Sequence, residues 1–191
     1  MEHVAVFRLI AGLGNPGRQY VGTRHNVGFL VLDELARRAA VPFQFEKKWN
    51  AEVAVCGGRM LMKPQTFMNL SGEAVNNYAR YHHLESSEIL VVIDDAAIPL
   101  GELRIRKSGS AGGHNGLESV LMHQATELVP RLRVGIGSTG GDLVDHVLGK
   151  FSPEEMPAME AAIKRAADAV EYANAHGIEA AMNIYNQKTT V

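Results

Sequence analysis

Residues 89–95 read ILVVIDD, and this stretch decides the fold class. Residues 89–93 are apolar at every position, and the run is too short for a buried helix. A strand that is apolar on both sides is typical of the centre of a sheet with helices on both faces. Because Asp94 and Asp95 follow directly, the carboxyl end of this strand carries two acidic side chains. In open α/β sheets, ligands bind at this end of the strands.

The segments on either side of this strand complete an α/β pattern. Hydrophobic periodicity predicts further strands at residues 4–11, 52–56, 59–63, 103–106 and 131–136, and helices at residues 26–40, 71–81, 117–124, 152–176 and 178–185. Gly57-Gly58 predicts an antiparallel hairpin, because both turn positions tolerate positive φ. The motif Ser152-Pro153 with Glu155 predicts the start of the long helix. The sequence therefore predicts a single α/β domain over residues 1–191, with a mixed central β-sheet flanked by helices on both faces.

The composition restricts the class of protein. Of the 191 residues, 46% are hydrophobic, and 19 basic residues stand against 21 acidic ones. No apolar run approaches the ~18 residues of a membrane helix, and the first residues lack the features of a signal peptide. The single cysteine excludes an intramolecular disulfide framework, and the eight histidines form no ligand cluster at a recognisable spacing. We expect a cytoplasmic protein that needs no metal and no cofactor.

Residues 12–17 read GLGNPG, a literal match to the G-x-G-x-x-G dinucleotide-binding fingerprint. In that fingerprint a helix opens at the glycines, so that its amino end meets the pyrophosphate. Here Pro16 and residues 18–23 intervene, and Asp33 lies inside the next predicted helix instead of at the end of a second strand. A nicotinamide oxidoreductase is therefore a minor alternative.

Polar side chains follow several of the predicted strands, or lie in loops that could meet them: Asn15, His25, Asn69, Asp94 and Asn115. An imidazole can take a proton from water at neutral pH. A carboxylate on its other nitrogen fixes the tautomer and stabilises the imidazolium. Amide side chains can hold the water and the reacting carbonyl. This combination indicates hydrolysis by water without a covalent intermediate, with an ester of a ribose hydroxyl as a reasonable target.

Each of these residues also has a simpler explanation. A histidine before a helix is often a cap or a surface group, and an aspartate at a strand end is often a turn residue. Asn69 could cap the following helix, and Asn115 could be a loop residue with positive φ. A functional site is favoured only if these side chains lie close together in the fold. The spacing of the residues in the sequence does not establish that they do.

Several blocks of sequence resemble the bacterial-type peptidyl-tRNA hydrolases. They read GLGNPG continuing to TRHNVGF at residues 12–29, KPQTFMNLSG at 63–72, DD with PLG at 94–101, GSAGGHNG at 109–116 and, more weakly, RLRVGIG at 131–137. Together they span nearly the whole chain in the family's order. The resemblance implies a monomeric, metal-independent esterase that frees tRNA from prematurely released peptidyl-tRNA.

The resemblance also implies roles for the polar residues. His25 matches the family's catalytic base, and Asp94 matches the carboxylate that supports it. Asn15 matches the residue that helps to distinguish N-blocked from free aminoacyl-tRNA. Asn69 and Asn115 match residues that position substrate and water.

The resemblance also implies a substrate groove that is lined by apolar side chains. Tyr20 and Phe67 match positions that line the groove for the tRNA 3′ end and the peptide, with Met68 beside them. Such side chains are more often part of a hydrophobic core.

A basic stripe provides a candidate RNA contact. Arg104, Arg106 and Lys107 could meet acceptor-arm phosphates, which would give affinity without reading sequence. Arg133 is a further candidate. The alternative is a charged strand edge that prevents pairing with other chains.

The chain departs from the family's usual pattern at two places. Ala97 stands where a further acid is usual, and Ser138-Thr139 stands where a basic residue followed by proline is usual. Neither change affects His25 or Asp94. A non-catalytic RNA-binding module with the same groove is the main rival interpretation.

Overall fold

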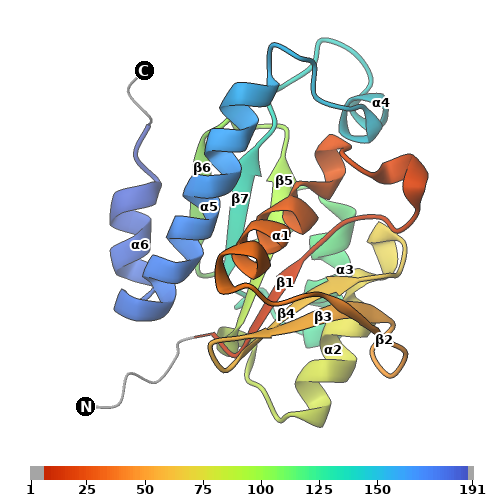
Figure 1. Ribbon diagram of the computed structural model, residues 1–191, viewed down its shortest axis with the longest axis vertical. Helices are drawn as coiled ribbons and strands as arrows, with labels where there is room; N and C mark the ends of the chain where they lie inside the picture. Colours follow the sequence, from red (N-terminus) through yellow and green to blue (C-terminus); the bar gives the residue numbers. More distant parts are fainter. Residues whose placement is uncertain (1–6, 189–191) are drawn as a thin grey trace.

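The computed structural model describes residues 7–188, which form a seven-stranded mixed sheet with helices on both faces (Figure 1). The strand order is β2-β3-β4-β1-β5-β7-β6. The strands are β1 Leu9–Gly12, β2 Gln44–Glu46, β3 Ala51–Cys56, β4 Arg59–Pro64, β5 Ile89–Asp95, β6 Leu103–Arg106 and β7 Arg131–Gly135. The helices are α1 Val27–Ala39, α2 Ser71–Tyr81, α3 Asn115–Gln124, α4 Leu143–Leu148, α5 Met156–His176 and α6 Ile178–Tyr185. The predicted fold class is confirmed.

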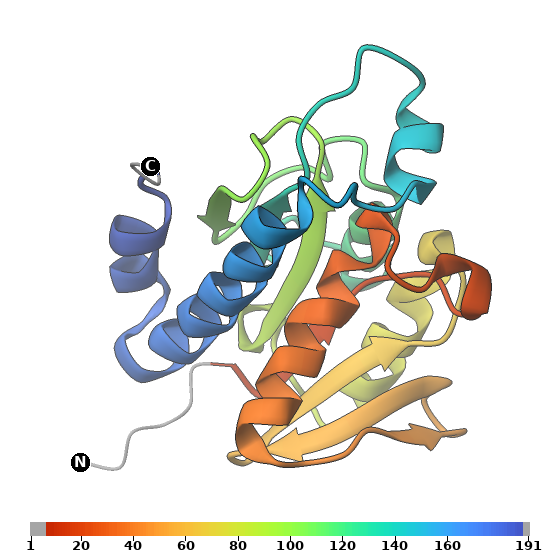
Figure 2. The ribbon, with the colours of Figure 1, turned by 45° about the horizontal axis from the view of Figure 1, so that its top comes forward.

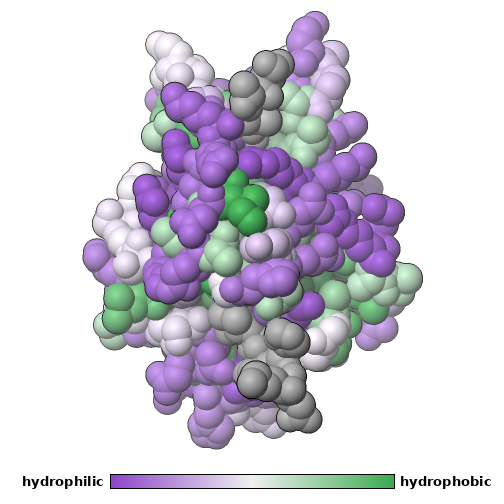
Figure 3. Space-filling view, turned by 90° about the vertical axis from the view of Figure 1, so that its left-hand side faces the viewer, coloured by the Kyte–Doolittle hydropathy of each residue, from purple (hydrophilic) through white to green (hydrophobic). Residues whose placement is uncertain are grey.

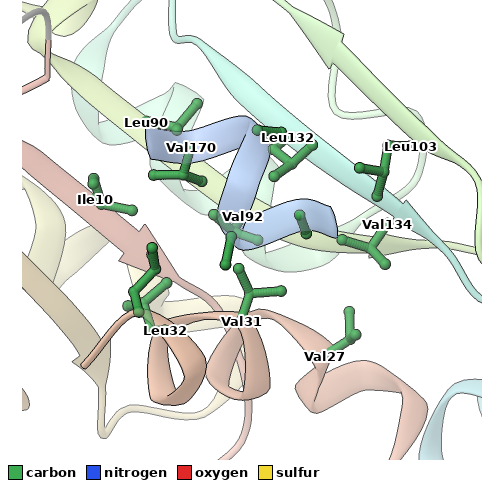
Figure 4. Close-up of a cluster of buried hydrophobic side chains, with 14 of the residues drawn as sticks. Ile10, Val27, Val31, Leu32, Leu90, Val92, Leu103, Leu132, Val134 and Val170 are labelled. Carbon is green, nitrogen blue, oxygen red and sulfur yellow. The ribbon is translucent and has the colours of Figure 1, made fainter. Parts of the chain in front are cut away.

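β5 lies in the interior of the sheet and pairs in parallel with β1 on one side and β7 on the other. Its residues alternate between two cores. Leu90 and Val92 face a cluster with α1, α5 and α6, and Ile89, Val91 and Ile93 face a cluster with α2 and α3. Figure 4 shows the first of these clusters. Burial on both faces explains why every position of the run is apolar.

The predicted hairpin is confirmed by β3 and β4, which pair antiparallel up to Cys56 opposite Arg59. Gly57 and Gly58 both have positive φ, at 57° and 77°. These are the conditions of a type I′ turn, whose twist matches that of the strands. The predicted first strand differs in its start, because β1 begins at Leu9. Residues 4–6 of that prediction lie outside the described part of the chain.

Several element boundaries differ from the sequence prediction. The long helix α5 begins at Met156, because Ser152 and Glu155 close their reciprocal capping bonds one turn earlier. α3 begins at Asn115, because His114 caps it. Two elements were not predicted from the sequence: β2, whose residues are all exposed, and α4, which has no buried residue. β2 has no buried face, and the apolar positions 143, 144, 147 and 148 of α4 have helical spacing but extend over only six residues.

Gly28 lets α1 lie directly on the sheet. A Cβ at this position would lie 2.5 Å from the carbonyl oxygen of Val92 and 2.7 Å from the backbone nitrogen of Leu13. Both neighbours are backbone atoms of sheet segments and have little freedom to move away. This contact fixes the start of α1, and His25 just before it, against β1 and β5.

Replacing Gly28 with alanine is expected to lower the free energy of unfolding by about 3 kcal/mol, the upper part of the range for overpacking a core. Urea denaturation measures the change. Gly140→Ala is the matched control, because a Cβ at Gly140 meets no atom within 4 Å. Equal stability of the two variants would contradict the close approach of α1.

A charge network joins α1 to α5 on the surface. Glu34 accepts hydrogen bonds from Arg37 and Arg38, and Arg38 reaches Asp168 on α5 at 2.7 Å. The hydrogen bonds from Arg37 and then Arg38 lower the pKa of Glu34 from its ordinary 4.5 to about 2. Because the folded-state pKa lies below the unfolded one, this stabilisation is complete above pH 4.5 and is lost as the pH falls through 2.

Glu34→Gln is expected to lower the free energy of unfolding by about 1 kcal/mol at pH 7, since solvent around Arg37 screens the network. At pH 3 the difference between wild type and variant is expected to shrink by about half or more. Urea denaturation at the two pH values makes the comparison. A difference that does not change with pH would contradict the assigned pKa shift.

α6 and the residue that follows it cover the β6 edge of the sheet. The Asn186 side chain accepts from the backbone nitrogen of Ile105 at 2.6 Å and donates to its carbonyl oxygen at 3.0 Å, as a neighbouring strand would. This protects a short edge strand from pairing with another chain. The outer face that carries α6 is mostly hydrophilic (Figure 3). Within residues 7–188, no helix is both long enough and apolar enough to span a membrane.

Candidate active site

The candidate site lies at the carboxyl ends of β1, β5 and β7. The segment with the short helices η1 (Arg18–Tyr20) and η2 (Arg24–Asn26), the loop before α3, and α4 gather at this end of the molecule (Figure 2). They surround a cavity of about 210 Å³, which is lined by His25, Asp94, Asn115 and Arg133 together with α4. The place of the site agrees with the expectation from residues 94–95.

Two histidines share one carboxylate oxygen at the floor of this cavity. His25 Nδ1 lies 2.8 Å from Asp94 Oδ1, and His114 Nε2 lies 2.9 Å from the same oxygen. The two ring centroids are 5.0 Å apart. Asp94 is only 3% exposed, so its charge is stabilised by these two rings and not by water.

Asp94 remains ionised throughout the useful pH range. Burial by itself would raise the pKa of this carboxyl, but His114 and then His25 outweigh burial and lower it to about 2. An ionised carboxylate is only an acceptor, so His25 Nδ1 carries the proton that it donates to Asp94. In the neutral ring, Nε2 then has a free lone pair on a residue that lines the cavity.

His114 has the opposite tautomer. Its Nδ1 accepts the backbone N–H of Leu117 at 3.1 Å and thereby caps α3. Nε2 therefore carries the proton that is donated to Asp94. The sequence analysis did not identify His114, although it stands three residues before Leu117, at a helix-cap spacing next to Asn115.

Arg24 fixes the segment that carries His25. Its backbone nitrogen donates to the Gly149 carbonyl at 2.9 Å, and its guanidinium donates to the Lys150 carbonyl and to Glu155, both at 2.7 Å. These bonds join η2 to the chain that follows α4. His25 and the helix that covers the cavity are therefore held as one unit.

The asparagines identified from the sequence occupy different environments. Asn115 lines the cavity as the first residue of α3, and its φ is not positive. Asn15 is buried beside the cavity, with its Oδ1 accepting the backbone N–H of Met68 at 2.8 Å. Asn69 is exposed on the short helix η3 (Met68–Leu70), and it makes no side-chain cap to α2. The structure thus brings Asn115 to the cavity, whereas Asn15 and Asn69 lie outside its lining.

Asn26 is a second residue that the sequence analysis missed. Its side chain accepts from the backbone nitrogen of Asn15 at 2.8 Å and donates to the Asn15 carbonyl at 2.9 Å. This pair of bonds holds the loop after β1 against η2. Its position directly after His25 was the available signal.

The apolar groove residues separate into two kinds. Met68 is 5% exposed and belongs to the core under α2 and α3, so it is a core residue and not an open groove wall. Phe67 is 57% exposed beside it. Tyr20 is half-buried on η1 and lies outside the lining of this cavity.

The basic residues are not a uniform stripe. Arg133 lines the cavity and lies 3.1 Å from Asp95 Oδ2. Arg104 donates to the Asn186 carbonyl at 2.8 Å, and Lys107 pairs with Glu179. The Arg106 side chain is exposed and makes no hydrogen bond or ion pair with any residue between 7 and 188. Arg106 and Arg133 are therefore the better candidates for phosphate contact, and the edge-protecting role fits Arg104.

The donor atoms of His25, Asp94 and His114 lie within 4.8 Å of one another, close enough to hold a metal ion. The prediction of a metal-independent reaction therefore needs a direct test with a chelator.

The glycine-rich segment after β1 does not open a helix, because η1 and η2 intervene and α1 begins only at Val27. The amino end of α1 is thus not at the glycines, where the dinucleotide fingerprint requires it.

Comparisons with known proteins agree on one family. The family model for peptidyl-tRNA hydrolase matches residues 9–191. The peptidyl-tRNA hydrolase of Synechococcus sp. (strain JA-3-3Ab) is 48% identical, with 97% of this chain and 84% of that protein covered. That of Listeria monocytogenes serotype 4a (strain HCC23) is 46% identical, with 95% and 100% covered. The crystal structure of the Acinetobacter baumannii peptidyl-tRNA hydrolase superposes with a TM-score of 0.91 at 32% identity over 99% of both chains. The chain belongs to the peptidyl-tRNA hydrolase family.

Proposed function

We propose that this protein hydrolyses the ester bond of peptidyl-tRNA, releasing free tRNA and peptide, with His25 as the general base. The observation that carries the proposal is the His25 ring, which donates Nδ1–H to Asp94 and faces the cavity with no partner for Nε2 among residues 7–188. A base in this state needs only a water molecule and a carbonyl carbon within reach.

In the proposed reaction, His25 Nε2 removes a proton from water as the water oxygen attacks the ester carbonyl carbon. The resulting imidazolium is stabilised by Asp94, which stays ionised. When the tetrahedral intermediate collapses, the bond from carbon to the ribose 3′-oxygen breaks, and His25 returns the proton to that oxygen. No covalent bond to the enzyme forms, and each turnover consumes one water molecule.

The amide side chains have supporting roles in this proposal. Asn115 lines the cavity and can hold the attacking water or the carbonyl oxygen. Asn15, whose Oδ1 is occupied by Met68, has its amide nitrogen left to donate to the acyl group. Asn69 is exposed and would contact substrate only outside the cavity.

His114 supports the base indirectly. Its bond to Asp94 holds the shared oxygen in place, and the cap on α3 holds His114 itself. We assign it the role of a positioning residue.

The RNA side of the substrate is proposed to lie over β7 and β6. Arg133 stands at the cavity, and Arg106 lies on the same face, opposite Arg131 in the antiparallel pair. Contacts to phosphate give affinity without sequence preference, which suits an enzyme that acts on many tRNAs. We also propose, from the family resemblance, that the protein acts in the cytoplasm as a monomer.

Arg106→Ala is expected to raise KM several-fold with little change in kcat, and to reduce the slope of log Kd against log salt by about 0.9. Filter binding and steady-state kinetics with tRNA substrates at several salt concentrations measure both. Arg59→Ala is the matched control, because Arg59 lies on β4, which β1, β5 and β7 separate from β6 in the sheet. Unchanged KM and slope would remove Arg106 from the RNA contact.

The proposed function is tested by the hydrolysis of N-acetylaminoacyl-tRNA beside the unblocked aminoacyl-tRNA, both with EDTA present. Rapid release from the blocked substrate alone is expected. Salt-sensitive tRNA binding without release would instead favour the non-catalytic RNA-binding module. Activity that EDTA abolishes would contradict the metal-independent mechanism.

A further inference from the structure

Arg131, the first residue of β7, is one of the largest side chains in the interior of the protein. It is 1% exposed, and β7 lies between β5 and β6 in the sheet (Figure 1). Its guanidinium donates to three main-chain carbonyl oxygens, which belong to Val129 at 2.8 Å, Ser110 at 3.2 Å and Glu127 at 3.4 Å. The proposed hydrolysis does not use this buried group.

The buried guanidinium keeps its positive charge. Burial and then the neighbouring Arg133 lower the pKa of Arg131 to about 10, which is still well above neutral pH. All its hydrogen-bond partners within residues 7–188 are neutral carbonyl groups. A buried cation without a carboxylate partner costs free energy, and an apolar side chain of similar size fills the same space at a lower cost. The role of Arg131 therefore lies in the segments that its bonds join, and not in filling the core.

The bonds of Arg131 join the chain before β7 to the β6–α3 loop, which comprises residues 107–114. Ser110 belongs to this loop, and Glu127 belongs to the chain before β7. A main-chain bond reinforces the junction, because the Gly109 backbone nitrogen donates to the Glu127 carbonyl at 3.1 Å. The first half of the loop is thus anchored at residues 109–110.

Four positions after Ser110, the same loop carries His114. Between them stand Gly112 and Gly113, which line the active-site cavity with φ of 60° and 83°. Glycine populates positive and negative φ about equally, so these two residues do not fix the path of the loop by themselves. The 2.9 Å contact of His114 with Asp94 requires one particular path. That path is set from the two ends of the segment, by the anchor at Ser110 and by the start of α3.

Arg133 approaches the same loop two positions further along β7. Side chains at i and i+2 of a strand lie on the same face. A Cβ on Gly112 would lie 2.6 Å from Arg133 Nη2, but Arg133 makes no hydrogen bond to the loop among residues 7–188. Of the two guanidinium groups, Arg131 is therefore the one that ties β7 to the loop.

We infer that Arg131 is a positioning residue, which holds the β6–α3 loop at Ser110 and thereby places the His114 ring on Asp94. Its consequence for catalysis rests on the proposed function. When the loop is released from Ser110, His114 leaves Asp94, and the carboxylate that orients His25 loses one of its two partners. The expected loss is in the chemical step, because the Arg131 side chain lies too deep to contact substrate.

The test compares Arg131→Met and Arg131→Lys with wild type. Methionine fills the space without a donor, and lysine keeps the charge but lacks the planar fork that reaches several carbonyls. For Arg131→Met, kcat for N-acetylaminoacyl-tRNA is expected to fall by about tenfold to a hundredfold, the cost of a small misplacement, with KM within about twofold of wild type. Arg131→Lys is expected to recover part of kcat.

Leu132→Ala is the matched control for stability. Leu132 is the next residue of β7, is 1% exposed and faces the core that contains α5, so its truncation destabilises the sheet without touching the loop. It is expected to lower the urea midpoint and to keep the wild-type kcat, measured well below that midpoint. An unchanged kcat in Arg131→Met, or a loss of kcat in Leu132→Ala as large as in Arg131→Met, would overturn the inference.

A spectroscopic measurement separates this inference from the proposed function. In protein labelled with ¹⁵N-histidine, NMR shows which ring nitrogen of His114 carries the proton, and wild type is expected to show Nε2–H. Arg131→Met is expected to lose this signal, and Leu132→Ala is expected to retain it. That pattern supports the hold of Arg131 on His114 even if no ester is hydrolysed.

The opposite result is equally clear. An unchanged His114 signal in Arg131→Met would reject the inference, and ester hydrolysis by wild type would still retain the proposed function. If Arg131→Met does not fold, Arg131→Lys replaces it in both measurements, with a smaller change of the same kind expected. Wild-type kcat together with a wild-type His114 signal in Arg131→Lys would then overturn the inference.

Discussion

His25→Ala is expected to lower kcat for N-acetylaminoacyl-tRNA by at least about 10³-fold, within the range that general base catalysis contributes. The ring supplies the only free imidazole nitrogen among the residues that line the cavity, because His114 Nε2 is directed at Asp94 and its Nδ1 at Leu117. Binding should change little, since the proposed phosphate contacts lie on β7 and β6. Single-turnover kinetics measure the chemical step, and tRNA binding is measured in parallel.

The fold should tolerate this change. His25 makes a single side-chain bond and is 12% exposed, and the Arg24 bonds that hold η2 use the backbone and the neighbouring side chain. His176→Ala, on the exposed last turn of α5, is the matched control and should retain full activity. Retention of more than about a tenth of the wild-type rate by His25→Ala would contradict its role as the base.

Asp94→Asn is expected to lower kcat by about 10³- to 10⁴-fold. The amide keeps the shape of the carboxylate but loses the charge that stabilises the imidazolium. It can also present an N–H to His25 Nδ1, which would favour the tautomer with Nε2 protonated. The expected effect is therefore on the chemical step and not on KM.

The wild-type pH profile tests the ionisation of Asp94. Because the pKa of Asp94 is about 2, the carboxylate does not titrate between pH 4 and 8. Its contribution to stability is present above its ordinary value of 3.8 and is lost as the pH falls through 2. Any loss of activity within this range therefore does not come from protonation of Asp94. Asp168→Asn, on the surface of α5, is the control, and a near wild-type rate for Asp94→Asn would contradict the shared-carboxylate mechanism.

The sequence predicted most of the fold because its strongest signals are physical constraints on backbone and burial. The run at residues 89–93 is apolar on both faces because two cores require it, and Gly57-Gly58 permits one kind of turn. The positions of His25 and Asp94 followed from the same logic, since strand ends and the loops beside them meet at one edge of a sheet. Their contact at 2.8 Å agrees with the expected convergence.

Other parts of the site depended on contacts that spacing does not encode. His114 is identified only when its ring is seen between Asp94 and Leu117. Arg104 and Arg106 stand in equivalent positions of the sequence pattern. Only Arg104 donates a hydrogen bond to the carbonyl oxygen of Asn186, which lies 82 positions away in the chain. α4 is only six residues long, so the helical spacing of its apolar positions 143, 144, 147 and 148 is a weak signal, although this helix covers the cavity.

The most direct test of the central claim is hydrolysis of N-acetylaminoacyl-tRNA in ¹⁸O-labelled water with EDTA present, followed by mass spectrometry of both products and of the intact enzyme. Multiple turnovers are expected, with one ¹⁸O in the carboxylate of the released N-acetylamino acid, none in the 3′-hydroxyl of the tRNA, and no acylated enzyme. Absence of release, label in the ribose hydroxyl, or an acyl-enzyme would contradict attack on the ester carbonyl by a water molecule that His25 activates.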